Sequence, residues 1–541
     1  MRPVFTGDEM RRLDERAIRE LGIPGATLME NAGRGAADAI LARLTSARRP
    51  ARGRRVALVC GKGGNGGDGF VAARWLARQG VRCDVLLVGS PGDVRGDAAQ
   101  KLEALKQARL RPTVVSDAAR LAPVLARADL VIDALLGTGA RAAPEGSIAE
   151  AITAINASGR PVLALDIPSG LPADGGPPYG PTVRADATVT FAGLKRGLVV
   201  PPGRDLAGRV SVVDIGVPAG EVARGISTFV LDAADVARHF PRREAAAHKG
   251  TYGHLLVVAG SLGKTGAAAL AAEGALRAGA GLVTVATAAT QQPVVAGLVL
   301  EAMTAALAEG APGVIGEAAW PALAELVAAR DAVAIGPGIG LDAGVRELAR
   351  RLVVEARVPM VVDADALTAL SGHLDLLRKA AAPRCLTPHP GELARLLEKQ
   401  VPDVERARIE VAREFATTHR VHLVLKGAVS VVAAPDGTAF LNPTGNPGMA
   451  SGGTGDVLTG IAGAFLARGL APGDALASAV YLHGLAGDVA AERVGEESLI
   501  ARDVIAALPE AFGRIERSEA PSGRATAERA GARAPGSPRV Q

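Results

Sequence analysis

The stretch GKGGNGGDG, residues 61–69, contains six glycines and only one acidic and one basic residue. The preceding segment RRVALVC (54–60) is short and apolar, which predicts a buried strand. In the following segment, FVAARWLARQG (70–80), the apolar residues recur at helical spacing. We therefore expect a strand-to-helix turn at the carboxyl edge of an α/β sheet. Bare amides and a helix N-terminus at such an edge form an anion site.

Two known glycine-rich motifs compete for this stretch. The phosphate loop G-x-x-x-x-G-K-[ST] does not fit, because Lys62 precedes the glycines and no Ser or Thr follows them. The dinucleotide fingerprint G-x-G-x-x-G fits at Gly61, Gly63 and Gly66, but it requires an acid at the end of the next strand. In that strand, VRCDVLLVGS, the acid is Asp84, near the start. An ordinary NAD-dependent dehydrogenase is excluded, and a glycine turn without a ligand is the alternative.

The composition is that of a globular protein. The 541 residues, 48% hydrophobic and 22% charged, provide about two to four domains at roughly 150 residues each. The net charge of +5 comes mostly from scattered Arg, without the basic blocks and interleaved aromatics typical of nucleic-acid binding. Cys60, Cys83 and Cys385 lack the spacing of a zinc site or a disulfide framework, which favours a reducing cytoplasm.

The chain offers no pattern for membrane insertion. Its first 20 residues read as a charged helix rather than a signal peptide. The most apolar long stretch, 266–287, includes Glu273 and Arg277 and is interrupted by glycines, so we expect a buried helix and strand. We therefore expect no membrane partner and no nucleic-acid partner.

The strand pattern occurs twice along the chain. The first half contains the apolar runs RRVALVC (54–60), VRCDVLLVG (81–89), LVIDALLGTG (130–139), PVLALDIPSG (161–170), ADATVTFAG (185–193) and RVSVVDIGV (209–217). The second half contains GHLLVVAGS (253–261), LVTVAT (282–287), DAVAIGPGIG (331–340), VPMVVDAD (358–365), RCLTPHPGE (384–392) and HLVLKGAVSVVAA (422–434). Continuous apolar runs suit parallel strands covered on both faces.

Composition changes set the predicted boundaries. The boundary between the halves falls near 219–228, giving domains 1–220 and 228–515. Residues 516–541 are polar and rich in Pro, Gly and Arg, which predicts a disordered tail.

Polar residues gather at the ends of the predicted strands in the first half. Asn65 and Asp68 follow the first strand, Asp133 lies in the third, and Asp166 and Ser169 lie at the end of the fourth. Ligands bind beyond the carboxyl ends of strands in open α/β sheets, so these side chains are expected to converge on one crevice. A turn-forming or capping role is the alternative for each residue taken singly.

A second glycine turn stands in the second half. Gly452, Gly453 and Gly455 precede an apolar helix that begins near Asp456. Amides on such a turn hold phosphoryl oxygens, and the carboxylate can take a proton from a nearby hydroxyl. The alternative for Asp456 is a favourable acid in the first helical turn.

These motifs resemble a known family. Residues 64–69, Asp133 with 136–139, and 166–170 are similar to NAD(P)H-hydrate epimerases, which have a Rossmann-like fold. Residues 248–254, 336–338, 387–392 and 453–456 are similar to ADP-dependent NAD(P)H-hydrate dehydratases, which have the ribokinase-like fold. The order of the two sets, over about residues 1–515, resembles the bifunctional NAD(P)H-hydrate repair enzymes. Gly64 departs from the pattern, since many relatives have a second Asn there.

The resemblance implies an α/β protein with an N-terminal Rossmann-like three-layer domain and a ribokinase-like α/β domain. The first would interconvert the epimers of hydrated NADH and NADPH (NADHX and NADPHX). The second would dehydrate the S epimer with ADP as co-substrate and Mg²⁺ beside the nucleotide. We also expect a homo-oligomer in the cytoplasm.

The resemblance also assigns site residues. It places K⁺ at Asn65, Asp133 and Ser169, which offer the oxygen ligands that a hard cation prefers. In the first half it places the hydrate at Gly64, Asn65, Gly66, Gly67, Asp68, Gly137, Thr138, Gly139, Ala140, Arg141, Ala142, Ala143 and Asp166. In the second half it places the hydrate at Ala267, Gly338, His389 and Asp456. The adenine nucleotide is placed at Lys426, Gly427, Ala428, Val429, Ser430 and Gly455.

We expect Asp166 to be the acid/base group of epimerisation and Asp456 the base that activates the hydroxyl for phosphorylation. Two other readings stay open. A ribokinase-like small-molecule kinase would accumulate a phosphorylated product. A binding or scaffold role for the first domain would not need Asp68, Asp133 and Asp166.

Overall fold

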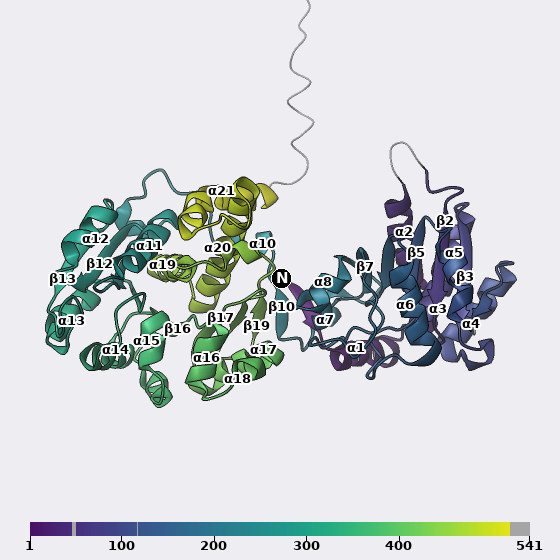
Figure 1. Ribbon diagram of the computed structural model, residues 1–541, viewed down its shortest axis with the longest axis horizontal. Helices are drawn as coiled ribbons and strands as arrows, with labels where there is room; N and C mark the ends of the chain where they lie inside the picture. Colours follow the sequence, from purple (N-terminus) through teal and green to yellow (C-terminus); the bar gives the residue numbers. More distant parts are fainter. Residues whose placement is uncertain (46–49, 116, 520–541) are drawn as a thin grey trace, which may run out of the picture. The chain divides into compact units, whose positions relative to one another are not determined.

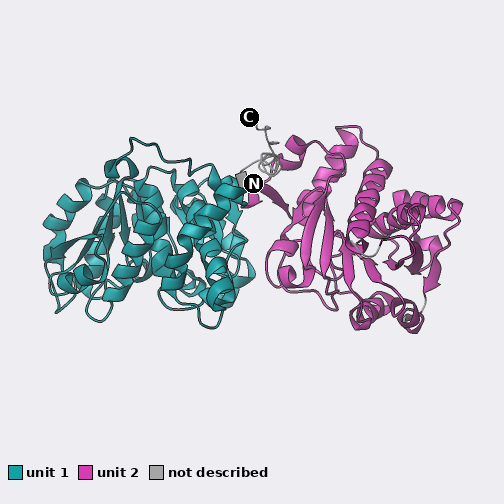
Figure 2. Cartoon of the chain, turned by 90° about the horizontal axis from the view of Figure 1, so that it is seen from above, with its two compact units in different colours: residues 1, 231–541 teal, residues 2–230 magenta. Residues whose placement is uncertain are grey.

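The computed structural model describes residues 1–45, 50–115 and 117–519. The chain divides into two compact units, Arg2–Val230 and Leu231–Gln541, with Met1 belonging to the second (Figure 2). We call them the N-terminal unit and the C-terminal unit. The division follows a short helix and a strand in the segment where the sequence predicts a linker, α9 (Ala219–Ala223) and β10 (Thr228–Val230).

The N-terminal unit is built on a parallel sheet with the order β4-β3-β2-β5-β6-β7-β9. Besides β10, the strands of this unit are β1 (Arg2–Phe5), β2 (Arg55–Cys60), β3 (Arg82–Val88), β4 (Thr113–Val115), β5 (Leu130–Ala134), β6 (Val162–Leu165), β7 (Ala187–Phe191), β8 (Leu194–Lys195) and β9 (Arg209–Val213). Besides α9, its helices are α1 (Gly7–Arg19), α2 (Gly25–Leu44), α3 (Gly64–Arg78), α4 (Gly96–Gln107), α5 (Ala122–Leu125), α6 (Gly146–Ala157), α7 (Arg196–Val199) and α8 (Gly203–Ala207).

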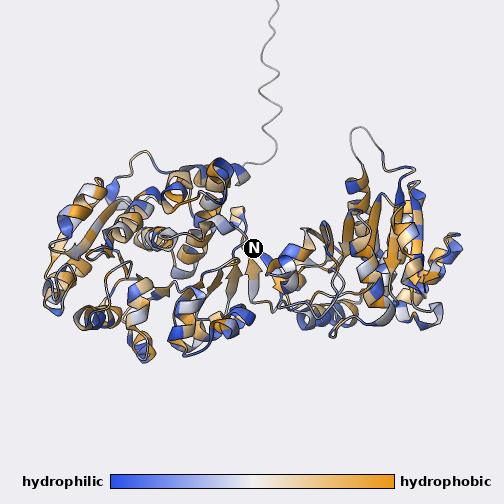
Figure 3. Ribbon diagram, viewed as in Figure 1, coloured by the Kyte–Doolittle hydropathy of each residue, from blue (hydrophilic) through white to orange (hydrophobic). Residues whose placement is uncertain are grey.

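The side chains of β2 show why helices cover both faces of this sheet. Val56, Leu58 and Cys60 belong to a core shared with α1, α2, α3 and α4. Ala57 and Val59 point the other way, into a core shared with α5 and α6. The strands therefore carry apolar residues on both faces, as Figure 3 shows by their orange colour. The strand order, which reverses between β2 and β5, is that of a Rossmann fold, and the predicted three-layer α/β architecture is confirmed.

The predicted strand-to-helix turn is present at residues 61–63, between β2 and α3, but the helix begins earlier than predicted. Helix α3 already begins at Gly64, and none of the glycines at 61–69 has a positive φ. A Cβ on Gly66 would lie 1.9 Å from the carbonyl oxygen of Gly61, and one on Gly61 would lie 2.1 Å from the carbonyl oxygen of Leu135. The glycines at 61 and 66 are thus required by close backbone packing, whereas Gly63 and Gly64 have nothing within 4 Å.

The C-terminal unit has its own parallel sheet in the order β13-β12-β11-β14-β15-β16-β17, followed by β18 and β19. Its strands are β11 (His254–Val258), β12 (Leu282–Ala288), β13 (Met303–Leu307), β14 (Ala332–Ile335), β15 (Met360–Val362), β16 (Arg384–Leu386), β17 (His422–Leu425), β18 (Val431–Ala433) and β19 (Ala439–Leu441). The run HLVLKGAVSVVAA thus forms two strands, which pair antiparallel. The order reverses between β11 and β14.

Helices flank this second sheet (Figure 1). They are α10 (Ala233–Ala237), α11 (Thr265–Arg277), α12 (Gln292–Leu298), α13 (Trp320–Ala328), α14 (Ala343–Glu355), α15 (Ala364–Ala369), α16 (Pro390–Leu396), α17 (Val401–Arg406), α18 (Arg408–His419), α19 (Thr454–Ala467), α20 (Pro472–Val494) and α21 (Ala501–Glu519). The 3₁₀ turns of the chain are η1 (Pro91–Asp93), η2 (Ala118–Arg120), η3 (Lys249–Tyr252), η4 (Glu317–Ala319), η5 (Leu374–Lys379) and η6 (Pro447–Met449).

The main core of the C-terminal unit joins β11 to four helices, α11, α19, α20 and α21. Helix α19 lies directly on α11, because Gly460 has no side chain and a Cβ there would be 1.9 Å from the carbonyl oxygen of Ala271. Helix α21 continues to Glu519, so residues 516–519 of the predicted tail are helical. The rest of that predicted tail, 520–541, lies outside the described residues. None of the helices in the described part of the chain combines the length and hydrophobicity that crossing a bilayer requires.

Replacing Gly66 should destabilise the N-terminal unit. In Gly66→Ala the new methyl group collides with the Gly61 carbonyl, and overpacking of this kind costs about 1–3 kcal/mol. Gly64→Ala is the matched control in the same helix, because a Cβ there meets open space. Calorimetric unfolding of the full chain should show a lowered transition for Gly66→Ala and an unchanged or slightly raised one for Gly64→Ala. Equal transitions for both variants would contradict this account of the glycine stretch.

Candidate active sites

A cavity of about 780 Å³ opens in the N-terminal unit where the strand order reverses. Its walls are the loop after β2, the loop after β5, the end of β6, strand β8, and side chains of α1 and α2. This volume suits a small-molecule ligand, and the position is the one where open α/β sheets bind ligands.

Most of the residues that the sequence places at the first-half hydrate site line this cavity. They are Gly64, Asn65, Asp68, Gly137, Thr138, Gly139, Ala140 and Asp166. Gly66 and Gly67 are buried against neighbouring backbone and side chains instead. Arg141 forms an ion pair with Asp8 at 2.5 Å. Ala142 and Ala143 follow Arg141 in the same loop and are not among the cavity-lining residues.

Asp166 is held by a buried lysine. Nζ of Lys195 donates to Oδ1 of Asp166 at 2.5 Å, and also to Oγ1 of Thr190 and the carbonyl oxygen of Phe191. Lys195 is only 1% exposed, and its position is set by β8, which pairs with β1 opposite Phe5. Asp166 itself has a φ of 62°, a backbone conformation that non-glycine residues adopt rarely and often at functional sites. Charge and backbone together therefore fix this carboxylate at the cavity.

Two further carboxylates at the cavity, Asp14 and Asp68, accept no hydrogen bond from the described residues. Burial raises the pKa of Asp14 to about 6, and the charge of Lys195 partly offsets this. Burial also raises the pKa of Asp68 well above its usual range, and the charges of Asp166 and Asp14 raise it further. The cavity therefore contains two carboxyl groups with raised pKa values, Asp14 and Asp68. It also contains one carboxylate, Asp166, that is paired with the ammonium group of Lys195.

The three residues predicted to hold K⁺ lie together beside the cavity. Oγ of Ser169 donates to Oδ1 of Asp133 at 2.6 Å, and the backbone amide of Ser169 donates to Oδ2 at 2.8 Å. Nδ2 of Asn65 donates to the carbonyl oxygen of Leu136, which leaves Oδ1 of Asn65 buried and without a hydrogen-bond partner among the described residues. Burial raises the pKa of Asp133 to about 6. An unpaired amide oxygen beside a buried carboxylate fits a hard monovalent cation.

In the C-terminal unit, the corresponding edge lies between the ends of β11 and β14. Gly338 has a φ of 61°, and a Cβ there would lie 2.8 Å from the Cβ of Lys264 and 3.3 Å from that of Ala267. Oγ of Ser261 donates to the carbonyl oxygen of Gly338 at 2.7 Å. Of the residues predicted to contact the hydrate in this half, Gly338 and Ala267 are therefore brought together by the loop after β14 and the first turn of α11.

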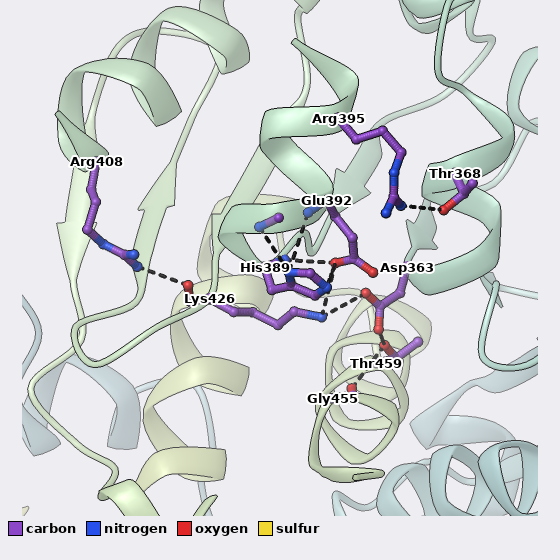
Figure 4. A network of polar contacts seen from close by, with 10 residues as sticks. Asp363, Thr368, His389, Glu392, Arg395, Arg408, Lys426, Gly455 and Thr459 are labelled. Carbon is purple, nitrogen blue, oxygen red and sulfur yellow. Dashed lines mark hydrogen bonds and ion pairs between the residues drawn. The ribbon is translucent and has the colours of Figure 1, made fainter. Parts of the chain in front are cut away.

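A polar network connects the ends of three further strands (Figure 4). Nζ of Lys426, after β17, donates to Oδ1 of Asp363 at 2.9 Å and lies 3.9 Å from Oε2 of Glu392. Oγ1 of Thr459 on α19 donates to the other oxygen of Asp363 at 2.5 Å. The nearby carboxylates raise the pKa of Lys426, although burial opposes them. Lys426 therefore carries its positive charge at this edge of the sheet.

His389 caps helix α16. Its Nδ1 accepts hydrogen bonds from the backbone amides of Gly391 and Glu392, and its own amide donates to Oε2 of Glu392. The imidazole is 56% exposed. His389 therefore has a structural role as the cap of α16. The exposed part of its ring remains accessible to a ligand.

Asp456 lies in the first turn of α19, beside the lysine network. A Cβ on Gly455 would be 3.4 Å from Nζ of Lys426, so the glycine turn and the lysine adjoin. Burial and the charge of Asp363 raise the pKa of Asp456 to about 7, against the effect of Lys426. The carboxylate accepts no hydrogen bond from the described residues. It is therefore able to exchange a proton with a bound ligand near neutral pH.

The loop from Lys426 to Ser430 is shaped by Arg408. Nη2 of Arg408 donates to the carbonyl oxygens of Lys426 and Val429, and Gly427 adopts a φ of 155°. A side chain at Gly427 would lie 2.4 Å from Nη2 of Arg408. Five of the six residues predicted to bind the nucleotide thus form one compact loop after β17, and the sixth, Gly455, lies at the start of α19.

The similarity to known proteins covers nearly the whole chain. A bifunctional NAD(P)H-hydrate repair enzyme of Moorella thermoacetica is 44% identical over 517 residues, which is 95% of this chain and 97% of the relative. The corresponding protein of Escherichia coli is 35% identical, over 93% of each chain. The chain belongs to the family of bifunctional NAD(P)H-hydrate repair enzymes.

Family models agree with this assignment to the NAD(P)H-hydrate repair family. Residues 25–197 match the YjeF-related protein N-terminus, and residues 255–510 match NAD(P)H-hydrate dehydratase. The C-terminal unit is also similar to the ADP/ATP-dependent NAD(P)H-hydrate dehydratase of Bacillus subtilis, crystallised with ATP and Mg²⁺. That structure is 33% identical, with a TM-score of 0.47, covering 53% of this chain and 98% of its own.

The structure of this repair-family protein adds residues that the sequence motifs do not mark. Lys195 and Asp14 in the N-terminal unit, and Asp363 and Thr459 in the C-terminal unit, all belong to the sites. For Asp14 a signal was present in the sequence, because an acid interrupts the apolar face of a helix. Lys195 and Asp363 follow apolar strands, but only tertiary pairing identifies their partners.

Removing the lysine should make stability depend more strongly on pH. In the folded protein the pKa values of Asp14 and Asp68 are raised, so their ionisation costs stability as pH rises through those values. Lys195 lowers both, so in Lys195→Met both pKa values rise further. The loss of stability relative to the wild type should therefore be larger at pH 8 than at pH 5, measured by thermal unfolding.

Thr190→Val provides the matched control, because it removes a hydrogen bond to Lys195 without changing charge. Its loss of stability should be the same at both pH values. A pH-independent loss in Lys195→Met would mean that the lysine contributes only packing and hydrogen bonds.

Proposed function

We propose that this protein repairs hydrated NADH and NADPH. The N-terminal unit interconverts the R and S hydrates, and the C-terminal unit dehydrates the S form with ADP, releasing AMP and phosphate. Near full-length similarity to bifunctional NAD(P)H-hydrate repair enzymes supports the pairing of activities. The observation that carries the proposal is that each unit places partly buried carboxylates without a hydrogen-bond partner among the described residues, with raised pKa, beside a lysine–carboxylate pair at the ends of its own strands.

The first reaction needs acid and base groups around one carbon. In the hydrate, C6 bears a hydroxyl and is bonded to the ring nitrogen N1. If the hydroxyl accepts a proton and leaves as water, the nitrogen lone pair forms an N1=C6 double bond. Water then adds to either face of this planar ion and gives up a proton. Asp166 serves in this exchange as acid/base, with Oδ1 bound to Lys195 and Oδ2 toward Gly137, where a Cβ would lie 3.4 Å from it.

Asn65, Asp133 and Ser169 would hold K⁺ beside the hydrate. A bound cation supplies a fixed positive charge that offsets the buried Asp133 carboxylate. The unpaired Oδ1 of Asn65 is the feature of this structure that supports the assignment. Asn65 also lines the cavity, so an ion at this place orders the loops that contact the hydrate.

The second reaction needs a better leaving group than hydroxide. Asp456 takes the proton of the C6 hydroxyl as the oxygen attacks the β-phosphorus of ADP, so a C6 phosphate ester forms and AMP leaves. Loss of phosphate from C6 and of a proton from C5 then restores the C5=C6 double bond. Lys426 and the amides of the glycine turn stabilise negative charge on the moving phosphoryl group.

The loops of the second site indicate which residues would contact the nucleotide and the hydrate. The nucleotide would contact the loop from Lys426 to Ser430 together with Gly455, and the hydrate would contact Ala267, Gly338 and His389. Among the described residues, no group of three or more His, Cys, Asp or Glu side chains is placed to hold a metal ion. Mg²⁺ would therefore be bound chiefly by the nucleotide phosphates, where it neutralises charge.

One assay tests the whole proposal. The purified chain is given a mixture of both hydrate epimers, and recovery of the reduced dinucleotide is followed by its absorbance with and without ADP. We expect complete recovery only with ADP. Stoichiometric accumulation of a stable phosphorylated product would indicate a small-molecule kinase instead. Recovery that stops when the S epimer is consumed would remove the epimerase activity from the proposal.

Asp456→Ala should abolish recovery from the pure S epimer and leave ADP binding near that of the wild type. Loss of general-base help reduces the rate by about 10²–10⁴-fold. Because the free Asp456 carboxyl titrates at about pH 7, wild-type kcat/KM for dehydration should rise with pH through that value and then level off. Calorimetry with ADP beside the recovery assay makes the measurement. Loss of ADP affinity with turnover retained at saturating ADP would make Asp456 a nucleotide contact and not the base.

Asp166→Asn should slow epimer interconversion by about 10²–10⁴-fold and leave dehydration of the pure S epimer unchanged. The substitution keeps the shape of the side chain and removes the carboxylate that Lys195 contacts. Interconversion is measured by chromatography of the two epimers. Thermal unfolding reports whether the N-terminal unit is folded, and the dehydratase activity does so for the C-terminal unit. Wild-type interconversion in the Asp166→Asn protein would exclude Asp166 as the acid/base group.

A further inference from the structure

Helix α1 presents an acid to the cavity in the middle of an apolar row. Met10, Asp14 and Ile18, spaced by four residues, all line the cavity. Leu13 and Ala17 on the adjoining face are buried in the core. An aliphatic side chain at position 14 would complete the apolar face of this helix, so the sequence places a carboxylate where packing alone would not.

The Asp14 carboxylate has no structural partner. The other acids near the start of α1 are engaged: Glu9 completes the capping box with Thr6, and Asp8 pairs with Arg11 and Arg141. No described residue donates a hydrogen bond to Asp14 or forms an ion pair with it, and it is partly buried. A partly buried, unpaired carboxylate costs stability, which indicates that its interactions are made with a ligand.

The charged groups nearest to Asp14 in the cavity come from the sheet edge. Lys195 on β8 and Asp166 after β6 both influence its ionisation, and Asp68 on α3 lines the same space. Lys62, Asp93 and Asp97 also line the cavity. Asp166 is bound by Lys195, whereas Asp14 is not, so the two carboxylates differ in their surroundings.

Epimerisation is a reaction that needs two such groups. Hydroxide must leave one face of C6 as water, and water must add to the other face, so a proton is donated on one side and accepted on the other. In the reverse direction the two groups exchange roles. A single carboxylate on one wall of the cavity does not reach both faces of a ring.

We propose that Asp14 is a second catalytic residue of the epimerisation, working on the opposite face of the nicotinamide ring from Asp166. This inference rests on the proposed function of the N-terminal unit. In one direction the carboxylic acid of Asp14 gives its proton to the leaving hydroxyl, the C6–O bond breaks, and N1=C6 forms. Water adds to C6 from the other face, N1 regains its lone pair, and the released proton passes to Asp166. After the turnover Asp166 releases this proton to water and Asp14 takes one up from water, so no other reactant is consumed; in the reverse reaction Asp166 is the acid and Asp14 the base.

The pKa of Asp14 supports this exchange of roles: raised by burial to about 6, it lets the group occur in both protonation states near neutral pH. Helix α1 precedes residues 25–197, the part of the chain that matches the model of the N-terminal domain. The site is thus completed by α1, which is separated from the glycine stretch by α2 and β2.

The test compares Asp14→Asn with Glu15→Gln. Glu15 is the next residue of α1, is exposed and makes no contact with the cavity, so Glu15→Gln removes the same charge from the same helix. Each full-length variant is assayed for interconversion of purified R and S hydrates, for dehydration of the S hydrate with ADP, and for thermal unfolding. Asp14→Glu, which restores a carboxyl group, is the rescue variant.

We expect Asp14→Asn to lower kcat of interconversion by about 10²–10⁴-fold in both directions, with KM changed little and dehydration unaffected. The Glu15→Gln variant should behave as the wild type, and Asp14→Glu should recover part of the rate. A folded Asp14→Asn protein with a wild-type kcat would overturn the proposal. So would a loss confined to KM, since that would make Asp14 a binding residue only. If the wild type itself fails to interconvert the epimers, the proposed function fails instead.

Discussion

Both units depend on backbone segments that approach one another more closely than any side chain allows. A Cβ on Gly66 would lie 1.9 Å from the Gly61 carbonyl oxygen, one on Gly460 would lie 1.9 Å from that of Ala271, and one on Gly336 would lie 1.8 Å from that of Asp363. These contacts seat a helix on the end of a strand, pack one helix directly against another, or bring the ends of two strands together. The polar residues beside them, such as Asn65, are positioned as a consequence of this packing.

The two sites share one electrostatic arrangement, although they belong to different folds. In each, a lysine is bound to one carboxylate: the buried Lys195 to Asp166, and the partly buried Lys426 to Asp363. In each, another carboxylate nearby has no protein partner among the described residues and a raised pKa, as in Asp68 and Asp456. The bound pair contributes a fixed dipole, and the unpaired group can exchange protons. Such a division of roles separates positioning from proton transfer within a small volume.

The sequence predicts where chemistry occurs better than it predicts which residues pair. Apolar runs and their polar ends located Asp133, Asp166 and the glycine turns, because strand ends in parallel sheets converge. The helical start at Gly64 was missed, since a run of glycines is a poor helix former and only the fit against Gly61 stabilises it there. The Lys195–Asp166 pair depends on a two-residue strand set by β1, a contact too distant in sequence to infer. The cytoplasmic location and the homo-oligomer stay predictions.

The cap on helix α16 has a consequence for what His389 can offer. Because Nδ1 accepts from the amides of Gly391 and Glu392, the ring proton must reside on Nε2. The Nε2 edge of the imidazole is therefore a hydrogen-bond donor, and Oε2 of Glu392 lies 3.7 Å from it. This edge therefore favours a ligand that offers a hydrogen-bond acceptor, such as a carbonyl or phosphate oxygen. The helix cap thus fixes the tautomer, and the tautomer fixes the polarity of the contact.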